Sequence, residues 1–185
     1  NRLISLPNNL GKIDHLTYLN LKNNNLEALP SSIGNLHSLK ELILLNNKLT
    51  QLPESLSKLQ LLEVLNVSDN PLDGVPSSVL SLTNLKELAI EGLHLKEIPP
   101  ELAEFENLEV LKARNNRIVE FPKFLCKLPN LKYVDLSSNP IKKLPDCIAQ
   151  MENLEHFNLK GNKLKGVPHE LRPFLESLHF VNLYG

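Results

Sequence analysis

The chain has 185 residues, with 20 Lys and Arg against 21 Asp and Glu, which gives a formal net charge of −1. This balance provides no bulk attraction for nucleic acid or for an anionic membrane. Hydrophobic residues make up 42% of the sequence and charged residues 22%, the composition of a folding chain and not of a disordered one. The two cysteines are too few for a framework of several disulfides. The longest apolar run, Leu42–Leu45, is too short to span a membrane.

A repeat of 23 residues runs through the chain. Prolines keep this spacing at Pro7, Pro30, Pro53, Pro76, Pro99, Pro122, Pro145 and Pro168. One unit reads Leu39-x-x-Leu42-x-Leu44-x-x-Asn47-x-Leu49-x-x-Leu52-Pro53-x-x-Leu56-x-x-Leu59. Units begin at residues 16, 39, 62, 85, 108, 131, 154 and 178, and the one that begins at Leu154 is one residue longer. A repeat of this length indicates a solenoid, because each unit buries its leucines only against its neighbours.

Within each unit the pattern predicts a strand, a turn and a short helical segment, in that order. Leu42 and Leu44 alternate with outward residues, which is the period of a strand. Asn47 follows where the chain turns inward, and its amide can satisfy backbone groups that the turn leaves unpaired. Pro53 suits the first position of a short helical or 3₁₀ segment, and the polar residues after it favour a helix start.

In-register asparagines are expected to form a ladder of turns along the array. Its predicted members are Asn24, Asn47, Asn70, Asn116, Asn139 and Asn162. Leu93 stands where one asparagine is due, and leucine cannot bond the turn backbone. Gly92 just before it permits an altered backbone there. Two interpretations stay open: a local change of curvature that shapes the binding face, or an irregular repeat that the array tolerates.

This pattern resembles the leucine-rich repeat over the whole chain, and most closely the 23-residue subtype with Leu-Pro in its second half. That subtype is typical of cytosolic scaffolds such as the Ras-suppressor, Scribble-like and plant Ras-group-related proteins. The resemblance implies an α/β horseshoe with a parallel sheet on its concave face and helical or 3₁₀ turns on its convex face. It also implies intracellular signalling partners, among them small GTPases or phosphatase subunits.

The open face of the sheet is the predicted site for a protein partner. Ile43, Leu45 and Val64 form an apolar cluster where water is expected, while Lys112 and Arg114 form a basic one with Tyr133 beside it. Such a mixture is typical of interface hot spots, although branched residues also favour strands for their own sake. The full set of candidate contact residues is Tyr18, Ile43, Leu45, Val64, Glu87, Glu91, Val110, Lys112, Arg114, Tyr133, Asp135, His156 and Lys160.

No catalytic or metal pattern stands out, and no cofactor is expected. His156 and His179 occupy similar places in consecutive units, and we expect them to be surface polar residues. Cys126 and Cys147 fall on neighbouring convex segments at different offsets, which favours free thiols over a disulfide. So little cysteine favours a reducing cytosol.

The chain is therefore expected to be one array, residues 1–185, that lacks polar caps and is an excerpt of a longer protein. The first interpretation is a non-enzymatic, cytoplasmic protein-interaction module. A second is the substrate-recruiting part of a larger enzyme such as a kinase, GTPase or ubiquitin ligase. A third is an extracellular or pathogen-surface recognition protein.

Overall fold

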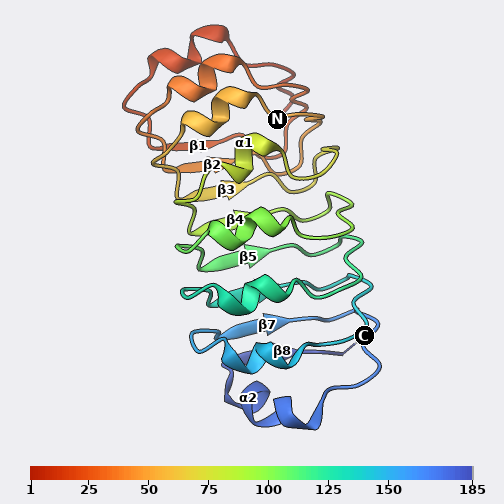
Figure 1. Ribbon diagram of the computed structural model, residues 1–185. Coiled ribbons are helices and arrows are strands. Elements are labelled where there is room, and N and C mark those ends of the chain that lie inside the picture. Colours follow the sequence, from red (N-terminus) through yellow and green to blue (C-terminus); the bar gives the residue numbers. More distant parts are fainter. Residues whose placement is uncertain (185) are drawn as a thin grey trace.

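A computed structural model describes residues 1–184 as an elongated stack of similar coils (Figure 1). Each coil contributes one three-residue strand to a single eight-stranded parallel sheet whose strand order follows the chain. The strands are β1 (Tyr18–Asn20), β2 (Glu41–Ile43), β3 (Val64–Asn66), β4 (Glu87–Ala89), β5 (Val110–Lys112), β6 (Tyr133–Asp135), β7 (His156–Asn158) and β8 (Phe180–Asn182). The predicted α/β solenoid is confirmed. Its expected last residue, Gly185, lies outside the described residues.

Short helical segments lie on the other side of the coil from the strands (Figure 1). They are η1 (Asn8–Lys12), η2 (Ser31–Asn35), η3 (Glu54–Lys58), α1 (Ser77–Leu80), η4 (Pro100–Glu104), η5 (Lys123–Lys127), η6 (Asp146–Gln150), η7 (His169–Leu171) and α2 (Arg172–Ser177), where η marks a 3₁₀ helix. The repeat prolines sit one position earlier than expected. Pro53, for example, is the capping residue before η3, and its carbonyl accepts the Leu56 N–H at 3.0 Å. The start of the helix is therefore set by the proline backbone, without a capping side chain.

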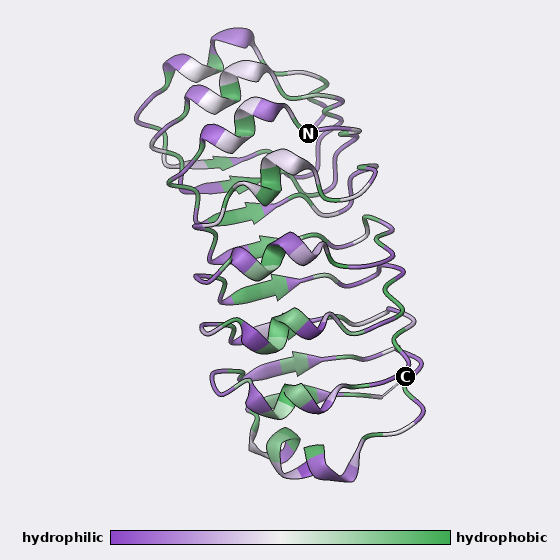
Figure 2. Ribbon diagram, viewed as in Figure 1, coloured by the Kyte–Doolittle hydropathy of each residue, from purple (hydrophilic) through white to green (hydrophobic). Residues whose placement is uncertain are grey.

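The core is a continuous column of leucine-like side chains between the sheet and the helical segments. The inward strand residues Leu42, Leu65, Leu88 and Leu111 are fully buried, as are the helical residues Leu56 and Leu102. Hydrophobic residues accordingly run along successive strands in Figure 2. Because each leucine row is completed by the next coil, burial is a property of the stack and not of one unit. No helix within residues 1–184 has the length and apolar character needed to cross a membrane.

The turn after each strand depends on a residue in the left-handed backbone region. These residues recur every 23 positions, with φ between 52° and 73°: Asn23, Asn46, Asp69, Gly92, Asn115, Ser138 and Gly161. Asparagine, aspartate and glycine adopt this conformation at least cost, which explains the residue types in the row. Gly92 therefore shares the left-handed backbone of its row, and the backbone of this coil departs from the others only after it, at His94.

The ladder asparagine follows the left-handed residue and connects its own coil to the preceding one. The Asn70 side chain accepts the Leu49 N–H at 3.1 Å and donates to the carbonyls of Leu44 and Val67, each at 3.0 Å. The asparagine is 3% exposed, so these backbone groups have no water to replace it. Asn47, Asn116 and Asn139 repeat the same three bonds.

The asparagine ladder is interrupted at Leu93, where the chain forms a different turn. His94 adopts φ 59° in addition to Gly92, and this second left-handed residue has no equivalent in the other coils described between residues 1 and 184. The Leu93 side chain is buried, and its N–H bonds Asn116 Oδ1 at 3.1 Å, together with the usual donor, Leu95. Asn116 thus accepts one more backbone N–H than the other ladder asparagines, that of Leu93 itself.

Cys126 and Cys147 form a disulfide between η5 and η6, so the expectation of free thiols is wrong. Their Cα atoms are 5.8 Å apart, within the range that a disulfide requires. The two residues are 21 apart in sequence, not 23, because on the helical side neighbouring coils meet at a shifted offset. The same offset separates Gly34 from Ser55. The Ser55 carbonyl oxygen lies too close to the position that a Cβ on Gly34 would occupy for that atom to fit.

Replacing Leu93 with asparagine tests whether the altered turn is a stable alternative to the ladder. We expect Leu93→Asn to lower the free energy of unfolding by about 2 kcal/mol or more, because a buried leucine is lost and the new amide enters a turn whose backbone differs from that of the ladder. Urea unfolding measures it, with Asn70→Ala as a reference expected to cost about 2–3 kcal/mol. A gain in stability for Leu93→Asn would show instead that the turn reverts to the ladder geometry.

Removing the disulfide tests its contribution to the stack. The Cys126→Ala, Cys147→Ala double variant is expected to lose about 3 kcal/mol of unfolding free energy, because the bond closes a loop of roughly 20 residues in the unfolded chain. Thermal melts with and without dithiothreitol measure the effect. The reductant should lower the melting temperature of the wild type and leave the double variant unchanged; equal sensitivity of the two proteins would contradict this assignment.

Candidate binding surface

We define the open sheet face as the strand side chains that point away from the leucine column. Two rows form its centre, at the first and third residues of each strand, and the same alternation extends it to the residue two positions after each strand, such as Leu45 or Arg114. The first row is Tyr18, Glu41, Val64, Glu87, Val110, Tyr133, His156 and Phe180, and the second is Asn20, Ile43, Asn66, Ala89, Lys112, Asp135, Asn158 and Asn182. The residues of each row are direct partners in the parallel register, so adjacent members are about 4.8 Å apart.

The predicted apolar cluster lies on this face at its N-terminal end. Ile43 and Val64 sit diagonally on neighbouring strands β2 and β3, and Leu45 follows two residues after Ile43. All three side chains are partly exposed, in contrast to the fully buried leucines behind them. They therefore offer apolar area to a ligand without being needed to fill the core.

The predicted basic cluster is divided by an ion pair. The Lys112 ammonium bonds the Glu87 carboxylate of the adjacent strand, so it is partly neutralised. Arg114 is exposed and forms no salt bridge with any residue in the range 1–184. Burial, reinforced by the charge of Asp135, raises the pKa of the nearby Glu91. Among residues 1–184 Arg114 is thus a cation without a salt-bridge partner, and it lies next to a carboxyl group that is costly to ionise.

Several polar residues in the second row terminate strands. Asp135 is buried, and its carboxylate accepts the Ser137 N–H at 2.8 Å and an Asn158 amide N–H at 3.0 Å. Asn20 and Asn66 accept the N–H two residues on in the same manner. These side chains hold the backbone where it leaves the sheet, which leaves less of their polar capacity for a ligand. The position of Asp135 in the repeat predicted a contact residue. It gave no indication of these hydrogen bonds.

Aromatic rings stack along the first row at its C-terminal end. The ring centroids of Tyr133 and His156 are 5.7 Å apart, and those of His156 and Phe180 are 6.0 Å apart. Burial, with the nearby Asp135 charge, raises the pKa of the Tyr133 phenol. Val110 precedes the stack on β5, so a strip of aliphatic and aromatic side chains crosses four adjacent strands. Reading the first row as a series of neighbours would have found this strip from the sequence.

The remaining candidate contacts lie at the ends and edge of the face. Tyr18 is exposed on β1, and its hydroxyl accepts a hydrogen bond of 2.8 Å from the Asn20 amide. Lys160, which follows β7, is exposed, and its backbone N–H bonds the Asn158 side chain.

A row of alternating charges, which the sequence analysis did not identify, borders the open sheet face. Its members immediately precede the strands: Lys40, Glu63, Lys86, Glu109, Lys132, Glu155 and His179. Glu63 lies 2.9 Å from Lys86 and 3.9 Å from Lys40, and Glu109 lies 2.8 Å from Lys132. Hydrogen bonds from Lys86 and Lys132 lower the pKa values of Glu63 and Glu109, respectively. We call this set the charge row.

Comparison with known proteins agrees with this architecture. Models of a leucine-rich repeat region match residues 33–120, and models of the leucine-rich repeat match residues 15–36, 106–164 and 129–183. The comparison with curated proteins found no match.

Solved structures extend the likeness over the whole chain. A leucine-rich repeat protein of Leptospira interrogans is 36% identical, with a TM-score of 0.92 over 100% of this chain and 47% of its own. The ectodomain of the Arabidopsis receptor kinase HAESA, solved with a peptide hormone, is 29% identical, with a TM-score of 0.82 over 98% of this chain and 32% of its own. The ectodomain of the Arabidopsis receptor kinase GASSHO1, solved with CASPARIAN STRIP INTEGRITY FACTOR 2, is 30% identical, with a TM-score of 0.74 over 96% of this chain and 22% of its own.

This chain spans about half of the Leptospira protein and a smaller share of the two receptor ectodomains. The repeat matches, the coil geometry and the likeness of structure over the full length lead to one conclusion: the chain belongs to the leucine-rich repeat proteins.

Proposed function

We propose that the chain is a non-catalytic recognition module that holds an extended protein or peptide segment across the open sheet face. The observation that carries this proposal is the presence of two partly exposed apolar regions on that face: Ile43 and Val64 on β2 and β3, and the stack of Tyr133, His156 and Phe180 on β6 to β8. Apolar and aromatic side chains on a rigid sheet lose little conformational entropy when they are covered, so they serve well as anchors.

Arg114 and the polar margin supply orientation in this proposal. An exposed arginine without an ion-pair partner can bond a carboxylate or a backbone carbonyl of the ligand with its planar guanidinium. Arg114 follows β5, so it lies between the apolar cluster near β2 and β3 and the aromatic stack that begins at β6. A ligand that spans the two apolar regions would therefore pass this cation.

We place this recognition outside the cytosol. The Cys126–Cys147 disulfide favours an oxidising compartment, since structural disulfides are rare in the cytosol. The HAESA and GASSHO1 structures are receptor-kinase ectodomains, and HAESA was solved with a peptide hormone bound. The cytosolic scaffold with a GTPase or phosphatase partner is supported by the Leu-Pro repeat consensus alone. A recruiting module within a larger enzyme is compatible with the same face.

Replacing one apolar and one basic residue of the open sheet face with glutamate tests the proposal. Peptides are first selected from a displayed random library for binding to the wild-type chain. Their affinity for the Ile43→Glu, Arg114→Glu double variant is then measured. We expect the affinity to fall at least about thirtyfold, equivalent to about 2 kcal/mol, because an apolar anchor and the free cation are lost together. Circular dichroism and melting temperature should stay close to those of the wild type, because both side chains are partly exposed.

A matched control carries the same change of charge away from this face. Leu61, which is 57% exposed, and the exposed Lys127 on η5 are replaced by glutamate. This variant should bind the selected peptides as the wild type does. If the open-face variant keeps its affinity, or if both variants lose it equally, the assignment of the binding surface is wrong.

A further inference from the structure

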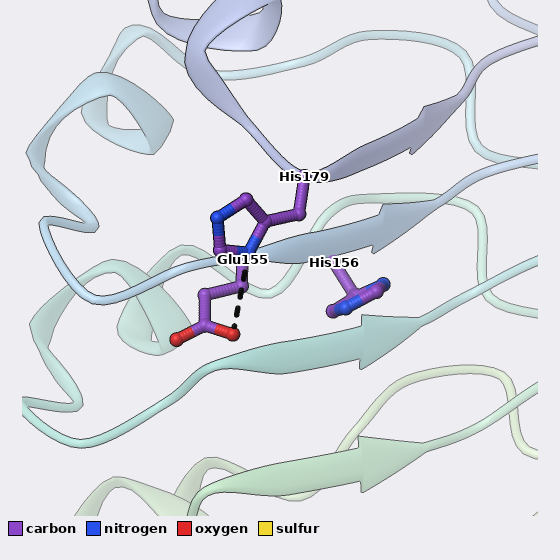
Figure 3. Close-up of side chains that lie close together, drawn as sticks. All are labelled: Glu155, His156 and His179. Atoms are coloured by element: carbon purple, nitrogen blue, oxygen red, sulfur yellow. Dashed lines mark ion pairs between the residues drawn. The ribbon is translucent and has the colours of Figure 1, made fainter.

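Three potential metal ligands converge where β7 and β8 begin. Glu155 immediately precedes β7, His156 is the first residue of β7, and His179 immediately precedes β8. Because His156 pairs with Phe180 in the sheet, the preceding residues Glu155 and His179 are brought side by side. Figure 3 shows the Glu155 carboxylate facing the His179 ring, with His156 beside them. One ligand atom from each residue lies within 4.8 Å of the others, and His179 Nδ1 is 3.5 Å from Glu155 Oε2.

This site arises because the charge row changes its residue type at its end. Lysines alternate with glutamates as far as Lys132 and Glu155, and the next position holds His179. A charged lysine has no lone pair for a metal, whereas a neutral imidazole is a common ligand. Lys132 makes its ion pair with Glu109, at 2.8 Å, and the Glu155 carboxylate faces the His179 ring.

The second imidazole is held in position by its neighbours on the open sheet face. The His156 ring stacks on Phe180 with an interplanar angle of 26° and lies against Tyr133 on its other side. Glu155 and His179 are less enclosed, since 47% and 72% of their side-chain surfaces are exposed. One fixed ring and two adjustable side chains can therefore close on an ion at a small cost in conformational strain.

We propose that Glu155, His156 and His179 bind one Zn²⁺ or a similar first-row transition metal ion. Two imidazoles and a carboxylate match the ligand preference of these ions, whereas Mg²⁺ and Ca²⁺ prefer oxygen ligands. Ligands on tetrahedral zinc stand about 3.4 Å apart, so the set needs to contract by roughly 1–1.5 Å. Three protein ligands leave at least one position open to water or to an outside ligand. The proposal does not depend on the docking of a peptide.

Isothermal titration of the tag-free full chain with zinc chloride tests this site. We expect one equivalent of Zn²⁺ to bind and Co²⁺ to give a visible absorption band from the same site. His179→Ala and Glu155→Gln should each weaken binding by more than about tenfold, since even the loss of an outer-shell partner costs that much. His156→Phe should do the same while it retains the aromatic stack, which separates loss of a ligand from loss of packing.

His15 supplies the matched control, because its Nδ1 also lies 3.5 Å from a carboxylate, that of Asp14, and both side chains are highly exposed. His15→Ala should bind zinc as the wild type does, and excess Mg²⁺ should not compete. The proposal is overturned if the wild type binds no zinc, if His179→Ala or His156→Phe binds as tightly as the wild type, or if Mg²⁺ displaces the ion. Unchanged circular dichroism identifies each variant as folded.

Discussion

The turn that leaves each strand is the constraint on which the whole array depends. There the chain must reverse inward among buried leucines, where unpaired backbone groups would be costly. A left-handed residue makes the bend, and the asparagine after it bonds the backbone of its own coil and of the preceding coil, as Asn70 does with Val67, Leu44 and Leu49. The leucine column makes stacking favourable, but the turn fixes how the coils are registered. At the altered turn of His94, Asn116 accepts a second backbone N–H, that of Leu93.

A rigid register also explains why the open sheet face is suited to recognition. Each strand is only three residues long, so it presents two outward side chains at defined positions. The core consists of nearly interchangeable leucines, whereas the outward rows differ from coil to coil. Apolar side chains at β2 and β3, a free guanidinium after β5 and an aromatic stack from β6 to β8 therefore lie on one nearly constant frame.

The strands could be predicted almost residue by residue, because a parallel in-register sheet translates sequence period directly into neighbours. Leu42, Leu65 and Leu88 are equivalent in sequence and adjacent in space. The disulfide could not be predicted in this way, since the helical segments of adjacent coils meet at an offset of 21, as Cys126 and Cys147 do. The sequence also identified which residues share the open face. It did not reveal that the Asp135 carboxylate bonds the Ser137 backbone N–H and the Asn158 amide, because the hydrogen bonds of a side chain depend on its rotamer and not on the sequence period.

The charge row has a consequence for how the chain finds its own register. Since the leucine code is almost the same in every coil, a coil that skipped its neighbour and stacked on the next one along would lose little hydrophobic contact. Such an error would set Lys40 against Lys86, or Glu63 against Glu109, where the native order pairs opposite charges. Individually weak surface ion pairs thus discriminate against misassembled stacks, and they give identical-looking coils an order that the leucines alone do not encode.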